Sequence, residues 1–136
     1  METTPAQLLR KAHATSDVEE LVSIGCDLAD SGEAGGAEYC FRRASDLGDA
    51  VAAFNLGNTL AGQKRFGEAV DAYELALERG ETGAWLNLGM VPHAHHNLAV
   101  LLERHGDLAG AERHFRHAAE NGDTLAEAAL RNLLED

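Results

Sequence analysis

The fold is decided by a stretch that recurs along the chain: DAVAAFNLG at residues 49–57 returns as ETGAWLNLG at residues 81–89, thirty-two residues later. A looser third copy, PHAHHNLA, occupies residues 92–99. Large apolar residues spaced by four mark the equivalent stretches, with a small residue beside the first of each pair: Ile24/Leu28, Leu56/Leu60 and Leu98/Leu102. This spacing lies on one helical face and predicts a helix that a second helix approaches closely.

A second stripe follows each of these stretches, with a small, an aromatic and a small residue at i, i+4 and i+7: Ala37/Phe41/Ala44, Ala69/Tyr73/Ala76 and Ala111/Phe115/Ala118. Short turn segments lie between the two stripes. Gly32 and Gly106 stand where a helix end needs a left-handed residue, whereas the middle unit has Gly62 two positions earlier. The unit is therefore predicted to be a helix-turn-helix, present three times.

This pattern resembles the tetratricopeptide repeat over about residues 18–123, and the junction at residues 118–126 also resembles the related Sel-like repeats. The resemblance implies an all-α fold, an α-solenoid of helix-turn-helix repeats in a right-handed superhelix. We expect one domain over residues 1–136. Its parts are an N-terminal helix, repeat 1, repeat 2, a truncated repeat, repeat 3 and a capping helix, at residues 5–14, 18–49, 50–81, 82–91, 92–123 and 124–134.

Helix-start signals define both ends. Thr4 as N-cap with Pro5 at the first helical position starts the first helix, and the segment at residues 15–17 caps the helix that begins at Val18. The last helix is expected to cover the final repeat with six apolar residues: Leu125, Ala128, Ala129, Leu130, Leu133 and Leu134. A solenoid needs such a cap at its end.

The truncated repeat breaks the period, because Leu88 is followed by the next equivalent position, Leu98, after only ten residues. Two geometries can absorb the missing half. Either a helix ends near Met90 and a new one begins at Pro92, or one kinked helix runs over residues 83–104. Gly89 and Pro92 both weaken a continuous helix and favour the break.

In either geometry an apolar face near the truncated repeat lacks the second helix that would cover it. Its residues are Trp85, Leu86, Leu88, Met90 and Val91. An exposed apolar face on a domain is a candidate contact surface. One hypothesis is a homodimer, including one formed by helix exchange; the other is that neighbouring helices close over the gap.

In the family that the chain resembles, the first helices of successive repeats line a groove that holds a peptide or a partner helix. The resemblance assigns the partner-binding role here to Ser23, Phe54, Asn55, Asn58, His93, His96, Asn97 and Arg104. Asn55 and Asn97 hold matching positions, and an amide can both donate to and accept from a peptide backbone. The alternative role for these asparagines is hydrogen bonding between helices of the repeat.

Charge restricts the partner. The formal net charge is −12, from 23 acidic and 11 basic residues, which disfavours nucleic acid and anionic membranes. One subgroup of the family binds acidic chaperone tails through basic groove residues, but the corresponding positions here are Val22, His93 and Asn97, so only the amide of Asn55 remains. We expect a neutral or basic protein or peptide partner.

Other chemistry is weakly supported. The seven histidines include i, i+3 pairs at His93/His96 and His114/His117, which makes a metal-binding module a less favoured alternative. No carboxylate or cysteine stands at a recognisable metal-ligand spacing, and the sequence has no phosphate-binding loop or nucleophile motif. We therefore expect no metal, no cofactor and no enzymatic activity. Cys26 and Cys40 are expected to be free thiols. The N-terminus predicts no secretory signal and hence a cytoplasmic protein, and Arg-rich, Lys-poor composition indicates a bacterial source.

Overall fold

A computed structural model describes residues 3–80 and 90–135, and within these ranges the secondary structure consists of helices without strands. The chain divides into two compact units, Met1–Ala72 and Tyr73–Asp136, with the division inside α5. The first unit contains α1 (Pro5–Ala14), α2 (Val18–Asp30), α3 (Ala34–Asp46), α4 (Ala50–Gly62) and the start of α5 (Phe66–Gly80). The second contains the rest of α5 with α7 (Met90–Arg104), α8 (Leu108–Glu120) and α9 (Thr124–Glu135).

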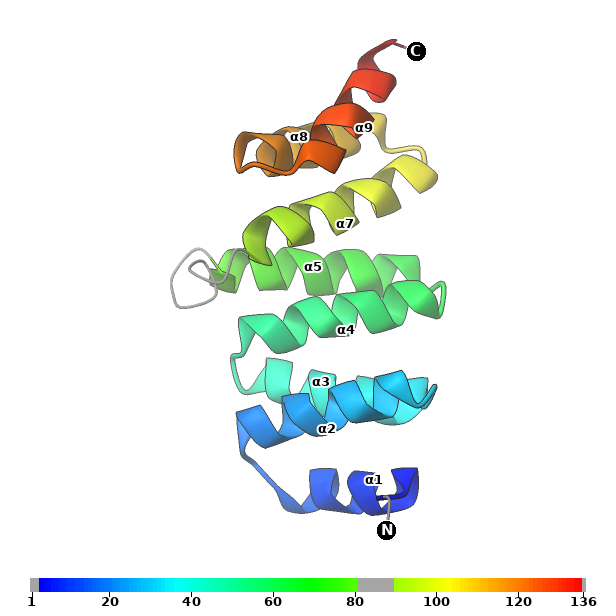
Figure 1. The fold of residues 1–136 in the computed structure, drawn as a ribbon, viewed down its shortest axis with the longest axis vertical. Coiled ribbons are helices and arrows are strands. Elements are labelled where there is room, and N and C mark those ends of the chain that lie inside the picture. Colours follow the sequence, from blue (N-terminus) through cyan, green and yellow to red (C-terminus); the bar gives the residue numbers. More distant parts are fainter. Residues whose placement is uncertain (1–2, 81–89, 136) are drawn as a thin grey trace. The chain divides into compact units, whose positions relative to one another are not determined.

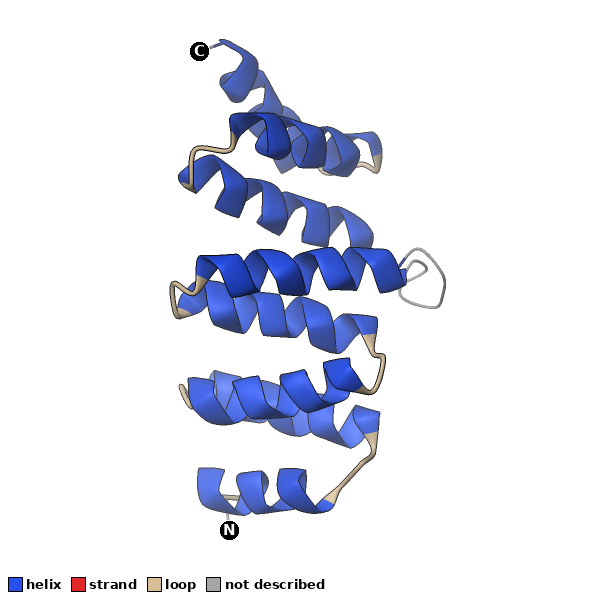
Figure 2. Cartoon of the chain, turned by 180° about the vertical axis from the view of Figure 1, so that it is seen from behind, coloured by secondary structure: helices blue, strands red, loops and turns tan. Residues whose placement is uncertain are grey.

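Several pairs of consecutive helices pack against each other within each unit. In the first unit α2 contacts α3 and α3 contacts α4, and in the second α7 contacts α8 and α8 contacts α9 (Figure 1). On either side of residues 81–89, short loops join successive helices, as the tan segments of Figure 2 show. The predicted all-α class, built from repeated helix-turn-helix units of α-solenoid type, is confirmed.

Side chains that precede the helices account for where they begin. Thr4 forms a capping box with Gln7, whose backbone N–H donates to Thr4 Oγ1 (3.2 Å) while its side chain accepts from the Thr4 N–H (2.9 Å). Aspartates cap later helices through the N–H three residues on: Asp17 for α2, Asp49 for α4 and Asp107 for α8. The predicted starts at Pro5 and Val18 are confirmed.

The turns end the helices with a left-handed residue. Gly32 and Gly106 have φ of +80° and +82°, as predicted. In the second repeat the left-handed position falls on Lys64, with φ of 62°, while Gly62 is the last residue of α4. The backbone N–H of Lys64 bonds to the carbonyl of Ala61, as that of Gly32 bonds to Ala29 (both 3.0 Å). The turn geometry is thus kept where its glycine is displaced.

The core of the first unit depends on a close approach between α2 and α3. A Cβ at Gly25 would lie 2.6 Å from the ring of Phe41, so the missing side chain makes room for the aromatic stripe of α3. Phe41 is 2% exposed, and two leucines of α2, Leu21 and Leu28, are fully or almost fully buried in the same unit. The predicted pairing of a small residue in the first helix with an aromatic in the second is present here.

In the second unit the core centres on Phe115 of α8, which is 1% exposed. Around it cluster small residues of three helices: Ala99, Ala111, Ala118 and Ala126. The expected buried face of α9 is partly wrong, since Leu125 and Leu134 are 72% and 57% exposed while Ala126 is fully buried. Ala129, Leu130 and Leu133 do pack against this cluster, so the inward stripe of α9 is rotated from the expected one.

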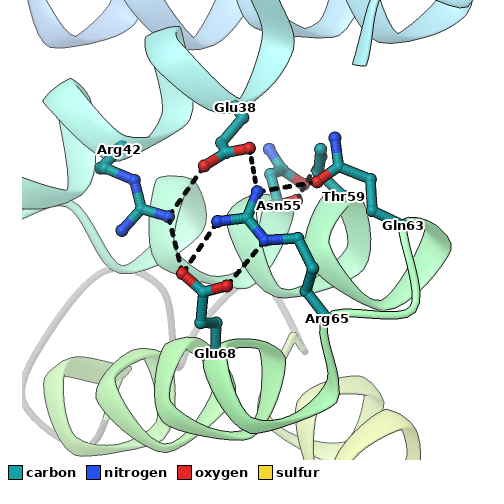
Figure 3. Close-up of polar contacts among 7 residues, drawn as sticks. All are labelled: Glu38, Arg42, Asn55, Thr59, Gln63, Arg65 and Glu68. Atoms are coloured by element: carbon teal, nitrogen blue, oxygen red, sulfur yellow. Dashed lines mark hydrogen bonds and ion pairs between the residues drawn. The ribbon is translucent and has the colours of Figure 1, made fainter. Parts of the chain in front are cut away.

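An ion-pair network ties α3 to the start of α5 in the first unit (Figure 3). Arg65 donates to Glu38 (2.5 Å) of α3 and to both oxygens of Glu68 (2.7 and 2.8 Å), and Arg42 donates to Glu38 (3.0 Å). Burial alone would raise the pKa of Glu38, but the hydrogen bonds from Arg65 and Arg42 lower it. This network therefore connects α3, the second helix of the first repeat, to the start of α5, the second helix of the next repeat.

Candidate functional site

Two hollows lie along the facing sides of α2 and α4. The first, of about 320 Å³, is lined near the start of both helices by Val18, Glu19, Val22, Ser23, Asp49 and Val51; we call it the valine hollow. The second, of about 360 Å³, is lined near their ends by Ala29, Gly32, Ala34, Asn58, Thr59, Gly62 and Gln63; we call it the amide hollow. Because the starts of both helices line one hollow and their ends line the other, the two helices run in the same direction.

We call the strip that joins the two hollows the α2–α4 groove. Cys26 lies on α2 between them and is exposed, and Asn55 lies on α4 and is half-buried. The valine hollow is acidic, because Glu19 and Asp49 line it and neither α2 nor α4 contains a Lys or Arg. Burial, followed by the charges of Asp30 and Asp27, raises the pKa of the Cys26 thiol. At the amide hollow, the guanidinium of Arg65 donates to the side-chain oxygen of Gln63 (3.0 Å). Negative charge is therefore concentrated at the end of the groove where both helices begin.

The structure places the predicted residues of the first unit unevenly. Ser23 and Asn58 are exposed and line the two hollows. Asn55 lies between them, and its backbone carbonyl accepts from the Thr59 hydroxyl (3.0 Å). Phe54 is only 7% exposed and belongs to the core, so its ring offers little surface to a partner.

In the second unit, two of the four predicted residues, Asn97 and His96, lie against other side chains. Asn97 shares a side-chain hydrogen bond with Tyr73, whose pKa burial raises to about 12 and this hydrogen bond lowers in part. This bond joins helices of two successive repeats, whereas the alternative stated for the asparagines was a bond within one repeat. His96 places Nδ1 3.1 Å from a carboxylate oxygen of Asp123, although not in the geometry of a regular hydrogen bond. His93 and Arg104 are exposed on α7.

A histidine cluster links α7 to α8. The Nδ1 atoms of His95 and His114 lie 2.9 Å apart, and the ring of His95 also stacks on that of His117, with centroids 4.7 Å apart. The i, i+3 spacing of His114 and His117 signalled the α8 side of the cluster. Its α7 member is His95 rather than His93 or His96, a choice that depends on how the two helices face each other.

The cluster does not have the form of a metal site. The ring centroids of His95 and His114 are 5.2 Å apart, which corresponds to the 2.9 Å contact plus the two ring radii. The two nitrogens therefore point directly at each other, so their lone pairs cannot converge on an ion beside them. Among residues 3–80 and 90–135, no group of three potential ligands is placed to hold a metal.

The residues predicted for self-association cannot be placed. Trp85, Leu86 and Leu88 lie outside the described residues, and Met90 and Val91 belong to the first turn of α7, where side chains are not described. The choice between one kinked helix and two also depends on residues 81–89, which are not described. The homodimer stays a prediction.

The repeats match a known family. A family model described as tetratricopeptide repeat matches residues 50–82 and 94–120, which contain α4 with α5 and most of α7 with α8. These two segments are tetratricopeptide repeats. The resemblance stated from the residues is thereby confirmed for the second and third repeats. Residues 18–49 lie outside the match, yet α2 and α3 form the same kind of helix pair.

Solved structures of tetratricopeptide proteins share the fold. One is the N-terminal domain of stress-induced protein-1 from C. elegans, with a TM-score of 0.74, 19% identity, and 93% of this chain and 96% of that chain covered. Another is the first tetratricopeptide domain of Spaghetti (RPAP3) bound to the HSP90 peptide SRMEEVD, with a TM-score of 0.73, 17% identity, and 87% and 90% covered.

A third is the Yersinia enterocolitica type III secretion chaperone SycD in complex with a peptide of the translocator YopD, with a TM-score of 0.70 and 20% identity, covering 87% of this chain and 89% of that chain. At these identities the likeness extends to the fold alone. No curated protein sequence matches the chain. In the part of the chain that the structure describes, no helix has both the length and the apolar character needed to cross a membrane.

Proposed function

We propose that this protein is a non-catalytic adaptor that binds an extended peptide segment of a partner protein in the α2–α4 groove. The observation that carries the proposal is the pair of hollows on the facing sides of two parallel helices, with exposed polar groups at both. A peptide lying along the strip would contact both hollows.

The comparisons support a peptide as the ligand. Two of the similar structures contain one, the HSP90 peptide SRMEEVD in one case and a peptide of the translocator YopD in the other. Tetratricopeptide repeats and adaptor-like neighbours of this kind typically have no enzymatic activity. A similar arrangement of helices in this chain is therefore suited to bind a peptide without catalysing a reaction on it.

The groups along the α2–α4 groove suit a peptide backbone. Ser23 places an exposed hydroxyl at one hollow, and Asn58 places an exposed amide at the other. The amide oxygen of Gln63, which also lines the second hollow, accepts from Arg65 (3.0 Å). Hydroxyl and amide groups can donate and accept, so they suit backbone N–H and C=O groups whatever the peptide sequence. Asn55, between the hollows, is assigned the same role, whereas Asn97 already bonds to Tyr73.

Charge selects the kind of peptide. The carboxylates of Glu19 and Asp49 line the valine hollow, and neither α2 nor α4 contains a Lys or Arg to offset them there. Complementary charge speeds association and excludes partners of like charge. We therefore propose a neutral or basic segment, and an acidic peptide such as SRMEEVD is disfavoured.

A displayed random peptide library tests this function. The library is selected on the wild type, and the enriched peptides are then assayed against a variant of the α2–α4 groove, Ser23→Arg with Asn58→Arg. The matched control, Ala109→Arg with Ala128→Arg, changes the charge equally at two exposed helical positions of the second unit. Circular dichroism checks that all three proteins are folded.

We expect peptides that bind the wild type and the control and lose at least about tenfold in affinity for the variant of the α2–α4 groove, a loss typical of a disrupted contact site. Peptides that bind this variant as well as the wild type would place binding elsewhere. A selection that enriches no peptide above an unrelated protein would contradict the proposal.

A further inference from the structure

We infer that the bound peptide carries an aliphatic side chain next to a Lys or Arg, with the aliphatic group in the valine hollow and the cation on the carboxylates of Glu19 and Asp49. This inference rests on the proposed function and specifies its partner. It is carried by the composition of that hollow, by its charge, and by its distance from the amide hollow.

The valine hollow is apolar on its walls. Val18, Val22 and Val51 are each half-buried and come from the two helices on either side, so their exposed methyl groups face a space of about 320 Å³. Exposed apolar surface of this kind gains from covering by another apolar group. An aliphatic side chain matches it better than a polar one.

The rim of the same hollow is anionic. Asp49 caps α4, and its Oδ2 accepts from the backbone N–H of Ala52 at 2.8 Å, which holds the carboxylate in place beside Val51. Glu19 supplies a second carboxylate from α2. The starts of α2 and α4 each contribute only about half a positive charge, so two full negative charges leave the rim anionic. A Lys or Arg side chain can lie along the valines and place its charge at this rim.

The spacing of the hollows sets the length of the peptide. Val22 and Ala29 line different hollows and are seven residues apart on α2, which is about 10 Å at a rise of 1.5 Å per residue. An extended peptide covers that distance in about three residues, at roughly 3.3 Å each. The aliphatic residue and the residue that contacts the amide hollow are thus about three positions apart.

Four labelled peptides test the assignment. Each is a fluorescein-labelled Ser/Gly nonapeptide with blocked ends, which carries at its centre Leu-Lys, Leu-Ser, Ser-Lys or Leu-Glu. Binding is measured by fluorescence anisotropy at low and high salt. We expect Leu-Lys to bind about tenfold more tightly than Ser-Lys and several-fold more tightly than Leu-Ser, with the second difference reduced by salt. Leu-Glu should bind most weakly.

A matched pair of variants assigns the preference to the rim. Glu19→Gln with Asp49→Asn removes both charges while Asn can still cap α4. Glu112→Gln with Asp107→Asn makes the same two changes on α8, where Asp107 is likewise the cap. We expect the first variant to bind Leu-Lys no better than Leu-Ser, and the second to behave like the wild type.

Equal binding of all four peptides, or a preference for Leu-Lys that survives Glu19→Gln with Asp49→Asn, would overturn the inference. If library-selected peptides bind the α2–α4 groove but carry no aliphatic and basic pair, the inference is wrong and the proposed function stands. If the selected peptides bind outside the α2–α4 groove, both are wrong.

Discussion

His95 of α7 and His114 of α8 meet head to head, with their Nδ1 atoms 2.9 Å apart. One of these nitrogens must carry the proton and the other must accept it, so the contact requires that the pair is not doubly protonated. Burial, followed by the charges of the neighbouring cations, lowers the pKa of both rings to about 4. His117 acts on both rings and Arg113 on His114, while Asp107 opposes the shift at His114.

Acid should therefore weaken the second unit through this pair. In the unfolded chain these histidines take up protons near pH 6.5, whereas in the folded unit they do so near pH 4. The contribution of the pair is complete above pH 6.5 and is lost as the pH falls from 6.5 to 4. Since both rings are only half-buried, we expect a total loss of about 1–2 kcal/mol. NMR titration of the histidine ring protons measures the two pKa values directly.

His114→Asn provides the comparison for this pH dependence. It removes one titrating ring, so the free energy of unfolding between pH 6.5 and 4 should fall less steeply in the variant than in the wild type. The carboxylates that titrate below pH 5 are common to both proteins and cancel in the difference. Identical slopes, or ring pKa values near 6.5, would contradict the role of the pair.

Gly25→Ala should destabilise the first unit, because the added Cβ would lie 2.6 Å from Cε1 of Phe41 in a packed core. Overpacking of this size costs about 1–3 kcal/mol. Urea unfolding followed by circular dichroism measures the change. In Gly35→Ala, the control in α3, the new Cβ meets no atom within 4 Å, so stability should stay level or rise by up to about 1 kcal/mol.

Lys64→Gly should stabilise the turn between α4 and α5. Lys64 has φ of 62°, a left-handed conformation that costs a residue with a side chain about 1 kcal/mol or more and costs glycine little. We expect a gain of about 0.5–1 kcal/mol in the free energy of unfolding. Lys64→Ala keeps the strain and should give no gain; a gain equal to that of the glycine variant would show that loss of the Lys side chain is responsible.

Glu38→Gln should weaken the network of Figure 3, because it removes the carboxylate that accepts from both Arg65 and Arg42. Solvent screens these groups, so the expected loss is below about 1 kcal/mol and shrinks at high salt. Glu112→Gln breaks an exposed pair with Arg116 on α8 and should have a smaller effect. An equal, salt-independent effect of both changes would argue against a network contribution.

Cys26 should react with a thiol reagent in the folded protein, while Cys40 should not, because Cys26 is exposed and Cys40 is fully buried. The pKa of Cys26 is raised by burial and by Asp30 and Asp27, so alkylation at neutral pH should be slower than for a model thiol. Mass spectrometry of timed samples locates the label. Both thiols should react in urea, and Cys26→Ser should abolish the fast reaction. Rapid labelling of Cys40 in the folded protein would show that the helix pair opens.

Much of the fold could be predicted because its signals are local. Thr4 and Asp17 cap their helices through N–H groups three residues away, and Gly32 follows α2 at the predicted turn. The small residue at Gly25 and the aromatic at Phe41 are sixteen positions apart, yet the repeat pattern alone paired them. Such contacts follow from helical periodicity within one repeat.

The candidate site was only partly predictable. Ser23 and Asn58 line the two hollows, but the hollows themselves depend on two helices that are separated by α3 in the sequence. Burial of Phe54 follows from how α4 is rotated, and the same is true of the exposed Leu125 in α9. The spacing of apolar residues in the sequence does not determine how far each helix is rotated about its own axis with an accuracy of one residue.

By itself, the sequence determined that this chain is built from tetratricopeptide-like helix pairs, because periodicity and capping act within a turn or a single repeat. The tertiary structure alone decided where the polar groups of the first helices lie. Asn97 is bonded to Tyr73 and His96 faces Asp123, whereas Ser23 and Asn58 are exposed and line hollows. These environments differ because each one depends on a neighbour from another helix.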